Sequence, residues 1–258
     1  MKNISAVAGI VIKELYRRKD FYALFIVTVV ICGLMAMLNI YNDTNIVRYL
    51  KEICLDLIWI SSLVIAITTT ARQIPAEREN RTLLPLLAKP LTRTQLILGK
   101  FLGCWLACGL ALLCFYLFFG ALAASREHHW LLLNYFQAGL MHWFLLGVIV
   151  AFALLGSLIF AAPSSNATIC FVLVGGILFV GRNLDRVALT LREPTRAIVN
   201  ALYYALPHLE FYDLRDLVVH NWPLVAWKYI VLALLYASFY MAVFLIGACL
   251  VFRRKAVN

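Results

Sequence analysis

The feature that most limits how this chain can fold is a set of long segments without Asp, Glu, Lys or Arg. Ile53–Ala71 is nearly as apolar and holds one charge, Asp56. An apolar helix of about 20 residues crosses a bilayer, and it satisfies its own backbone hydrogen bonds there. The chain is therefore expected to be integral to a membrane. The uncharged segments are Phe21–Leu38, Phe101–Ser125, His128–Gly181 and Tyr229–Phe252.

The number of spans follows from the lengths of these segments. His128–Gly181 is too long for one helix and is interrupted by Pro163-Ser164-Ser165-Asn166, which predicts two spans joined by a tight turn. The first apolar run exceeds a signal-peptide core, so it is expected to be retained. The predicted fold class is an all-α integral membrane protein with six transmembrane helices in one domain, 1–258. The predicted spans are 21–41, 53–71, 98–124, 136–162, 165–182 and 228–252.

The first 20 residues show helical periodicity. Apolar side chains recur every three or four positions, and the charged ones fall off that stripe. This pattern predicts an amphipathic helix over 1–20 that lies in the membrane interface. The stripe consists of Ile4, Val7, Ala8, Val11, Ile12 and Leu15.

The formal charge of +10 is explained by the membrane rather than by nucleic acid, because the basic residues flank the spans. Membrane lipid is an expected partner, and nucleic acid is not. With six spans, both termini share one side, and that side carries 14 of the 23 Lys and Arg residues. Cationic loops stay in the cytoplasm, so both termini are predicted to be cytoplasmic.

A dense charged segment, Arg72–Lys100, separates the second and third spans. Its sequence is RQIPAERENRTLLPLLAKPLTRTQLILGK. The apolar run Leu83–Leu87 has no reason to face cytosol unless another protein covers it. We therefore interpret 72–95 as a docking element.

Small residues recur at the start of the third span. Gly99, Gly103, Ala107 and Ala111 are four apart, so they share one helix face and let another helix backbone approach closely. This stripe predicts helix packing, either within the subunit or between two subunits.

The longer connection 183–227 is aromatic and charged. Two short helices separated by Pro207 are expected on the outer side, and Tyr203 and Tyr204 suit an interfacial aromatic belt. Two interpretations stay open: a cap on the outer leaflet, or an exit gate that includes Tyr203, Tyr204 and Pro207.

Motifs for chemistry are not found. Gly99-Lys100 superficially resembles a phosphate loop, but Thr94 stands where its first glycine belongs and Phe101 where Ser or Thr belongs. No HExxH occurs, and the cysteines lie in or beside apolar spans. We therefore expect no catalytic residue, metal or cofactor on this chain. His142 is either a hydrogen-bonded packing residue or a substrate contact.

The docking element resembles the signature of ATP-binding cassette (ABC) type-2 permeases, especially the group of multicopper-enzyme maturation systems. An acidic-basic cluster, Thr, an apolar pair, Pro, Ser/Thr-Arg and Gly-Lys follow in that order. A Pro-centred segment before the last span, Leu206–Asp213, is also similar, and Pro85 departs from the pattern. The matching residues are Glu77-Arg78-Glu79, Arg81-Thr82, Leu86-Leu87, Lys89-Pro90, Thr92-Arg93 and Gly99-Lys100.

This resemblance implies a permease subunit in a bacterial inner membrane, and most relatives export. A separate P-loop ATPase would bind ATP and Mg and would push a coupling helix within 72–95. A second permease subunit, identical or paralogous, would complete the path. The residues carried over to the ATPase contact are Glu77, Arg78, Glu79, Arg81, Thr82, Leu83, Leu86, Leu87, Pro90 and Arg93.

Three other functions fit the sequence less well than a permease subunit does. An ATP-independent carrier or channel needs polar or charged groups at mid-span, and the spans offer few. A membrane-embedded enzyme needs histidines that converge with carboxylates, and only His208, Glu210 and Asp213 are close in sequence. A structural anchor does not explain the docking element.

Overall fold

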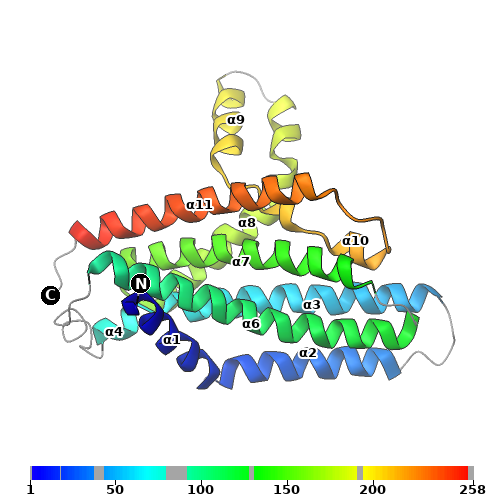
Figure 1. Ribbon diagram of the computed structural model, residues 1–258. Helices are drawn as coiled ribbons and strands as arrows, with labels where there is room; N and C mark the ends of the chain where they lie inside the picture. The colour runs from blue at the N-terminus through cyan, green and yellow to red at the C-terminus, as the bar shows by residue number, and fades with distance from the viewer. Residues whose placement is uncertain are drawn as a thin grey trace.

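The computed structural model describes residues 2–17, 19–37, 44–79, 92–127, 131–190 and 194–254, and over these ranges its regular structure is entirely helical. Long helices lie along a common direction as a bundle (Figure 1). Helix α1 and the last turn of α11 lie at one end, named here the terminal end, and the opposite end is the far end. The bundle helices are α2 (Lys19–Met37), α3 (Thr44–Ala71), α6 (Arg93–Glu127), α7 (Leu132–Ile159) and α11 (Trp227–Arg254).

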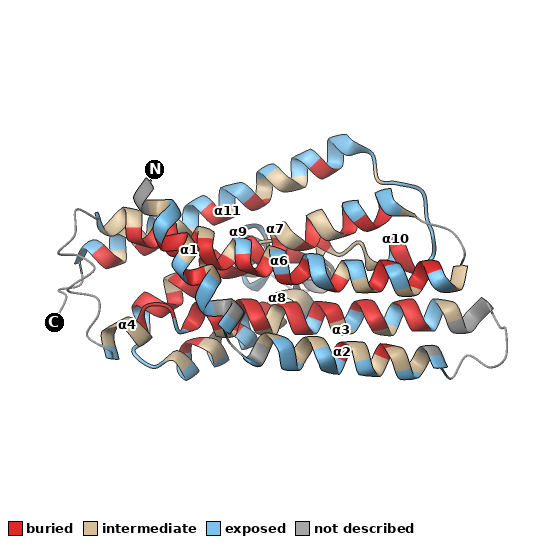
Figure 2. Cartoon of the chain, turned by 60° about the horizontal axis from the view of Figure 1, so that its bottom comes forward, coloured by how far each residue is buried: buried red, intermediate tan, exposed pale blue. Residues whose placement is uncertain are grey.

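Helix α7 is the centre of the bundle. It packs against α3, α6, α11 and also α8 (Pro163–Thr190), so residues around its circumference, such as Leu145, Val150 and Leu154, are fully buried. Helix α11 packs by one stripe only, which contains Ile230, Ala237 and Met241, and its other faces are exposed (Figure 2). Apolar side chains on such outward faces are stable against lipid tails.

Four segments are long and apolar enough to cross a membrane: Val47–Glu79, Arg93–Glu127, Leu132–Ile159 and Trp227–Arg254. Phe21–Met35 and Pro163–Phe179 are shorter apolar helices. They coincide with the first and fifth predicted spans. The structure therefore shows a multi-pass membrane protein, and a count of six spans stays a prediction.

A sharp turn joins α7 to α8. Helix α7 ends at Ile159 and α8 begins at Pro163, a first-turn position that suits proline because no N–H is needed there. Asn166 is fully buried and donates a hydrogen bond from Nδ2 to the carbonyl of Ala153 at 3.0 Å. A Cβ at Gly156 would lie 2.1 Å from Asn166 Oδ1. Glycine at position 156 is therefore required for this close approach.

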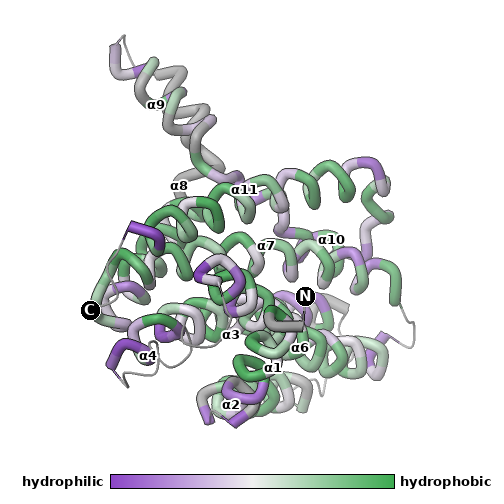
Figure 3. Tube along the Cα trace, turned by 60° about the vertical axis from the view of Figure 1, so that its left-hand side comes forward, coloured by the Kyte–Doolittle hydropathy of each residue, from purple (hydrophilic) through white to green (hydrophobic). Residues whose placement is uncertain are grey.

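The connection from α8 to α11 contains short helices. Helix α9 (Thr195–Ala205) pairs with α8, and α9 projects from the bundle together with the end of α8 (Figures 1 and 3). A 3-10 helix, Leu209–Tyr212, follows and packs on α7 and α8. Helix α10 (Arg215–Val219) then packs on α3 and α7. The connection therefore leaves the bundle and returns to its core.

Helix α1 (Lys2–Arg17) does not rely on lipid alone to cover its apolar stripe. It packs extensively against α6, and Val7, Ala8 and Val11 are buried there. The predicted amphipathic helix exists, but protein covers part of the face that we expected to lie on the membrane.

Candidate coupling site

A buried lysine joins three segments at the terminal end. Lys100 in α6 is 3% exposed. Its ammonium lies 2.7 Å from Glu77 Oε1 in the short helix α4 (Pro75–Glu79). It also donates to the backbone carbonyl of Gln73 at 3.2 Å and to the Gln73 side chain at 3.1 Å. A buried charge persists only when it is paired and hydrogen-bonded. The end of α3, helix α4 and α6 are therefore fixed to one another here.

Helix α4 is the described part of the predicted docking element. Ile74 and Pro75 are buried, whereas Glu79 is exposed. Glu77, Arg78 and Glu79 thus form the last turn of α4, and Lys100 contacts this helix on its inner side. The charged part of α4 is hydrophilic (Figure 3). The remaining predicted contacts, Arg81, Thr82, Leu83, Leu86, Leu87 and Pro90, lie outside the described residues.

The start of α6 is defined by a capping box. Gln95 N–H donates to Thr92 Oγ1, and Thr92 N–H donates to Gln95 Oε1, both at 3.2 Å. This reciprocal arrangement satisfies two backbone donors at the helix N-terminus. The Thr-x-x-Gln spacing therefore fixes the point at which the docking segment becomes α6.

Arg93 links this start to the last helix of the chain. Its Nη1 donates to the carbonyls of Phe252 at 3.0 Å and Arg253 at 3.2 Å, and its guanidinium lies 5.6 Å from the centre of the Phe252 ring. These carbonyls belong to the last turn of α11, where a cation is favoured. The structure thus places Arg93 against α11, and its predicted contact with an ATPase stays a prediction.

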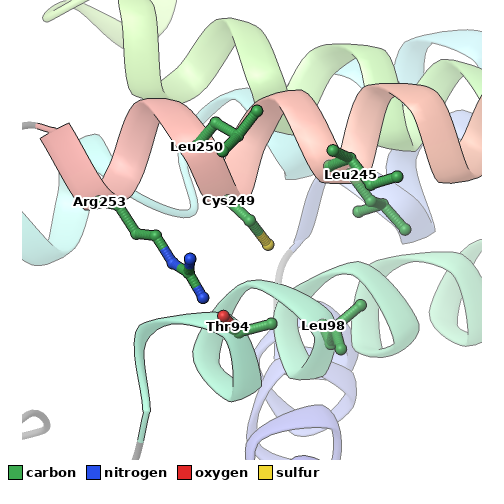
Figure 4. A pocket seen from close by; sticks show the side chains of 7 residues that line it. Thr94, Leu98, Leu245, Cys249, Leu250 and Arg253 are labelled. Carbon is green, nitrogen blue, oxygen red and sulfur yellow. The ribbon is translucent and has the colours of Figure 1, made fainter.

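A groove of about 340 Å³ lies beside this contact, between α6 and α11. Leu98 of α6 and Leu245 and Leu250 of α11 give it an apolar wall, while Thr94, Cys249 and Arg253 lie toward its polar end (Figure 4). The two helices therefore meet at Arg93 without closing completely over the adjacent turns.

The small-residue stripe of α6 receives α1. A Cβ at Gly99 would lie 2.7 Å from the Cβ of Val7, and one at Gly103 would lie 2.7 Å from the Cβ of Val11. Ala107, one turn further, is 1% exposed. The stripe thus serves packing within the subunit, one of the two outcomes that the sequence left open. Because Lys100 follows Gly99 directly, α1 lies next to the lysine that holds α4.

The predicted outer-gate residues surround a turn that is attached to α11. The backbone N–H of His208 donates to Tyr236 Oη at 3.2 Å, and Tyr240 Oη donates to the carbonyl of Leu206 at 3.4 Å. Pro207 lies between these two contacts. The Tyr203 ring lies 4.4 Å from that of His208, whereas Tyr204 is 76% exposed. A gating role for Tyr203, Tyr204 and Pro207 stays a prediction.

An ion cluster that sequence reasoning missed attaches α10 to α3. The guanidinium of Arg215 donates two hydrogen bonds to Asp213, from Nε at 2.8 Å and from Nη2 at 2.7 Å, and its Nη1 contacts Asp56. Its guanidinium lies 4.7 Å from the centre of the Trp59 ring. The hydrogen bonds to Asp213 raise the pKa of Arg215. Asp56, a lone charge in an apolar run, was the available signal.

His142 was expected to be either a hydrogen-bonded packing residue or a substrate contact, and its surroundings are those of a packing residue. It is 1% exposed, its Nε2 lies 2.8 Å from Ser62 Oγ, and its ring stacks on Trp59 at 5.3 Å. A hydrogen-bonded core histidine accounts for these contacts. In the portion of the chain with assigned positions, no three His, Cys, Asp or Glu side chains gather as a metal site would require.

The apolar helices and their packing define a multi-pass membrane protein whose docking segment is fixed to two of the long helices. The family model of ABC-2 family transporter proteins matches residues 6–257. The chain therefore belongs to the ABC-2 transporter family and is a permease subunit of an ABC transporter, as the resemblance of the docking element predicted. The narrower likeness to multicopper-enzyme maturation systems stays a prediction. A comparison with curated proteins finds no match.

Proposed function

We propose that this chain is the membrane subunit of an exporter in a bacterial inner membrane, with both termini in the cytoplasm. A separate P-loop ATPase binds ATP and Mg, docks on the segment around α4, and drives the bundle between inward- and outward-facing states. A second permease subunit, identical or paralogous, completes the substrate path.

The contact of Lys100 with Glu77 and Gln73 is the observation that supports this function best. A short docking helix transmits force only if it is attached to the spans that must move. Lys100 attaches α4 to α6, and Gln73 continues directly from the end of α3. Displacement of α4 by an ATPase would therefore be transmitted to two long helices at once.

The charged surface of α4 and the apolar run that follows it suit a protein partner. Glu79 is exposed, and Leu83, Leu86 and Leu87 come next in the sequence. A polar rim around an apolar centre is the usual composition of a protein–protein interface. We assign the leucines to a socket on the ATPase, and Glu77, Arg78, Glu79 and Arg81 to its rim.

The test uses the full-length chain purified together with its ATPase and reconstituted in lipid vesicles. Hydrogen exchange of α3 and α6 is compared with and without ATP, a readout that needs no knowledge of the substrate. We expect ATP to change exchange in both helices, and we expect Glu79→Arg and Leu86→Asp to abolish that change while both variants stay folded. Glu52→Arg, an exposed acid at the far end of α3, is the matched control and should respond normally.

Two results would contradict the proposal. One is an unchanged ATP response in both docking variants. The other is substrate transport by the purified chain in the absence of any ATPase, which would establish an ATP-independent carrier or channel instead.

A further inference from the structure

A cavity of about 700 Å³ with charged residues in its wall opens at the far end of the bundle, away from the coupling site. It lies between the start of α3, the end of α6 and the loop that follows α10. Arg48 comes from α3, Arg126 and Glu127 from α6, and His220 and Asn221 from the loop. Apolar side chains complete its wall at Val47, Leu131 and Val219.

Three polar side chains form a hydrogen-bonded triangle at the wall of this cavity. Lys51 is 1% exposed and contacts Glu127, and it donates to Asn221 Oδ1 at 2.9 Å. Asn221 Nδ2 donates to Glu127 Oε1 at 3.2 Å and closes the triangle. Asn221 has a positive φ of 53°, a conformation that asparagine tolerates better than most residues. The triangle thus fixes α3, α6 and the loop in a defined arrangement around the cavity.

The charge of the cavity is positive. Arg48 and Arg126 line it together with one carboxylate, Glu127, and Lys51 pairs with that carboxylate from behind. Among the described residues that line or back the cavity, three cations therefore stand against one anion. Arginine is the side chain whose planar fork best matches the oxygens of a phosphate group.

The position of the cavity indicates that a phosphate group bound there would belong to a membrane lipid. Arg48 and Arg126 stand at the ends of two apolar helices that are long enough to cross a membrane. Trp222 is 54% exposed and stacks on His220, a lining residue of the cavity, with the ring centres 5.0 Å apart. Exposed tryptophan marks the level of lipid headgroups. The apolar wall residues provide contacts for the glycerol and the first methylenes of a lipid.

We propose that this cavity binds the headgroup phosphate of a membrane lipid through Arg48 and Arg126. The site is independent of the coupling mechanism, and its test requires no ATPase. Failure of this inference would therefore leave the proposed function intact, and the reverse also holds.

The experiment uses the delipidated full-length chain in detergent, and bound lipid is counted by native mass spectrometry. The probes are dioleoyl phosphatidylglycerol, dioleoylglycerol, which has the same chains without phosphate, and inorganic phosphate. We expect phosphatidylglycerol to bind best. The double variant Arg48→Gln/Arg126→Gln should weaken that binding by about tenfold or more, because charge-assisted hydrogen bonds are lost. Lys228→Gln, which removes an exposed cation outside the cavity, should bind as the wild type does.

Three results would contradict the assignment of a lipid phosphate to this cavity. Equal lipid binding by the double variant and the wild type would overturn the proposal, and so would equal binding of dioleoylglycerol. Competition by inorganic phosphate at the concentration of the lipid would overturn the assignment to a lipid. If the double variant does not fold, Arg48→Gln alone tests the same point, since Arg48 is exposed on the first turns of α3.

Discussion

Trp105 and Trp143 exchange a reciprocal pair of hydrogen bonds across α6 and α7. The indole N–H of Trp105 donates to the carbonyl of Trp143 at 3.0 Å, and that of Trp143 donates to the carbonyl of Trp105 at 3.1 Å. The rings are stacked, with centres 4.7 Å apart. Each indole also covers a glycine of the other helix: Trp105 covers Gly147, and Trp143 covers Gly109.

These glycines should not tolerate a side chain. A Cβ at Gly109 would lie 2.5 Å from Trp143 Nε1, and one at Gly147 would lie 2.8 Å from Trp105 Nε1. We expect Gly109→Ala and Gly147→Ala to lower the apparent free energy of unfolding by roughly 1–3 kcal/mol, because overpacking displaces the indoles. Denaturant titration in detergent measures this effect. Gly33→Ala, with nothing within 4 Å of its Cβ, is the control and should not destabilise.

Removal of the Lys100 ammonium should weaken the terminal end. We expect Lys100→Met to destabilise the protein by about 3 kcal/mol, because it leaves the Glu77 carboxylate without the cation beside it. The double variant Lys100→Met/Glu77→Gln should regain part of the loss. Thermal unfolding checks the energy, and hydrogen exchange in α4 checks the location. A single variant as stable as the wild type would show that this pair does not hold α4.

Crowding of the small-residue stripe should detach α1. Gly99→Leu places carbon atoms where Val7 now lies, so we expect amide exchange in the middle of α1 to become about tenfold faster or more. Gly99→Ala, which adds only the Cβ, should raise exchange less than Gly99→Leu does. Gly9→Ala, on α1 but with open space around it, should leave exchange unchanged. Normal protection in Gly99→Leu would disprove the contact.

The two carboxylates that contact Arg215 should differ in importance. The Asp213 carboxylate accepts three hydrogen bonds from Arg215, whereas the Asp56 side chain is 51% exposed. We expect Asp213→Asn to cost roughly 1–3 kcal/mol and Asp56→Asn to cost less than about 1 kcal/mol. Thermal unfolding ranks the two variants. The reverse ranking would show that attachment to α3 matters more than the local bond in the loop.

The helices could be predicted from the sequence because a charge-free run of this length has few alternatives. The residues at which the helices begin and end were harder to predict. The second span was predicted to begin at residue 53, yet α3 begins at Thr44. The extension contains Lys51, which pairs with Glu127 in a distant part of the chain, and within the apolar run Asp56 pairs with the equally distant Arg215. Local apolarity carries no information about such pairing.

The residues of the candidate site could be predicted from the sequence, but the contacts between them could not. Glu77 and Lys100 both belong to the pattern that resembles the family signature, yet they lie near opposite ends of the charged segment Arg72–Lys100. Their ion pair could therefore not be predicted from that pattern. Arg93 was assigned to the ATPase contact, and nothing in the sequence indicated that it bonds to the last turn of α11. The indole–glycine exchange follows from Trp and Gly spaced by four in both helices, a repeat that becomes meaningful only once α6 and α7 are seen to be neighbours.

The double indole contact also limits how the bundle can rearrange. Sliding of α6 along α7 would break both hydrogen bonds and lift each ring from its glycine at the same moment. The two helices should therefore move as one rigid block, so that a displacement of α6 is transmitted to α7. An opening for cargo would then have to form at the borders of this block, where α2 and α8 make fewer contacts with it.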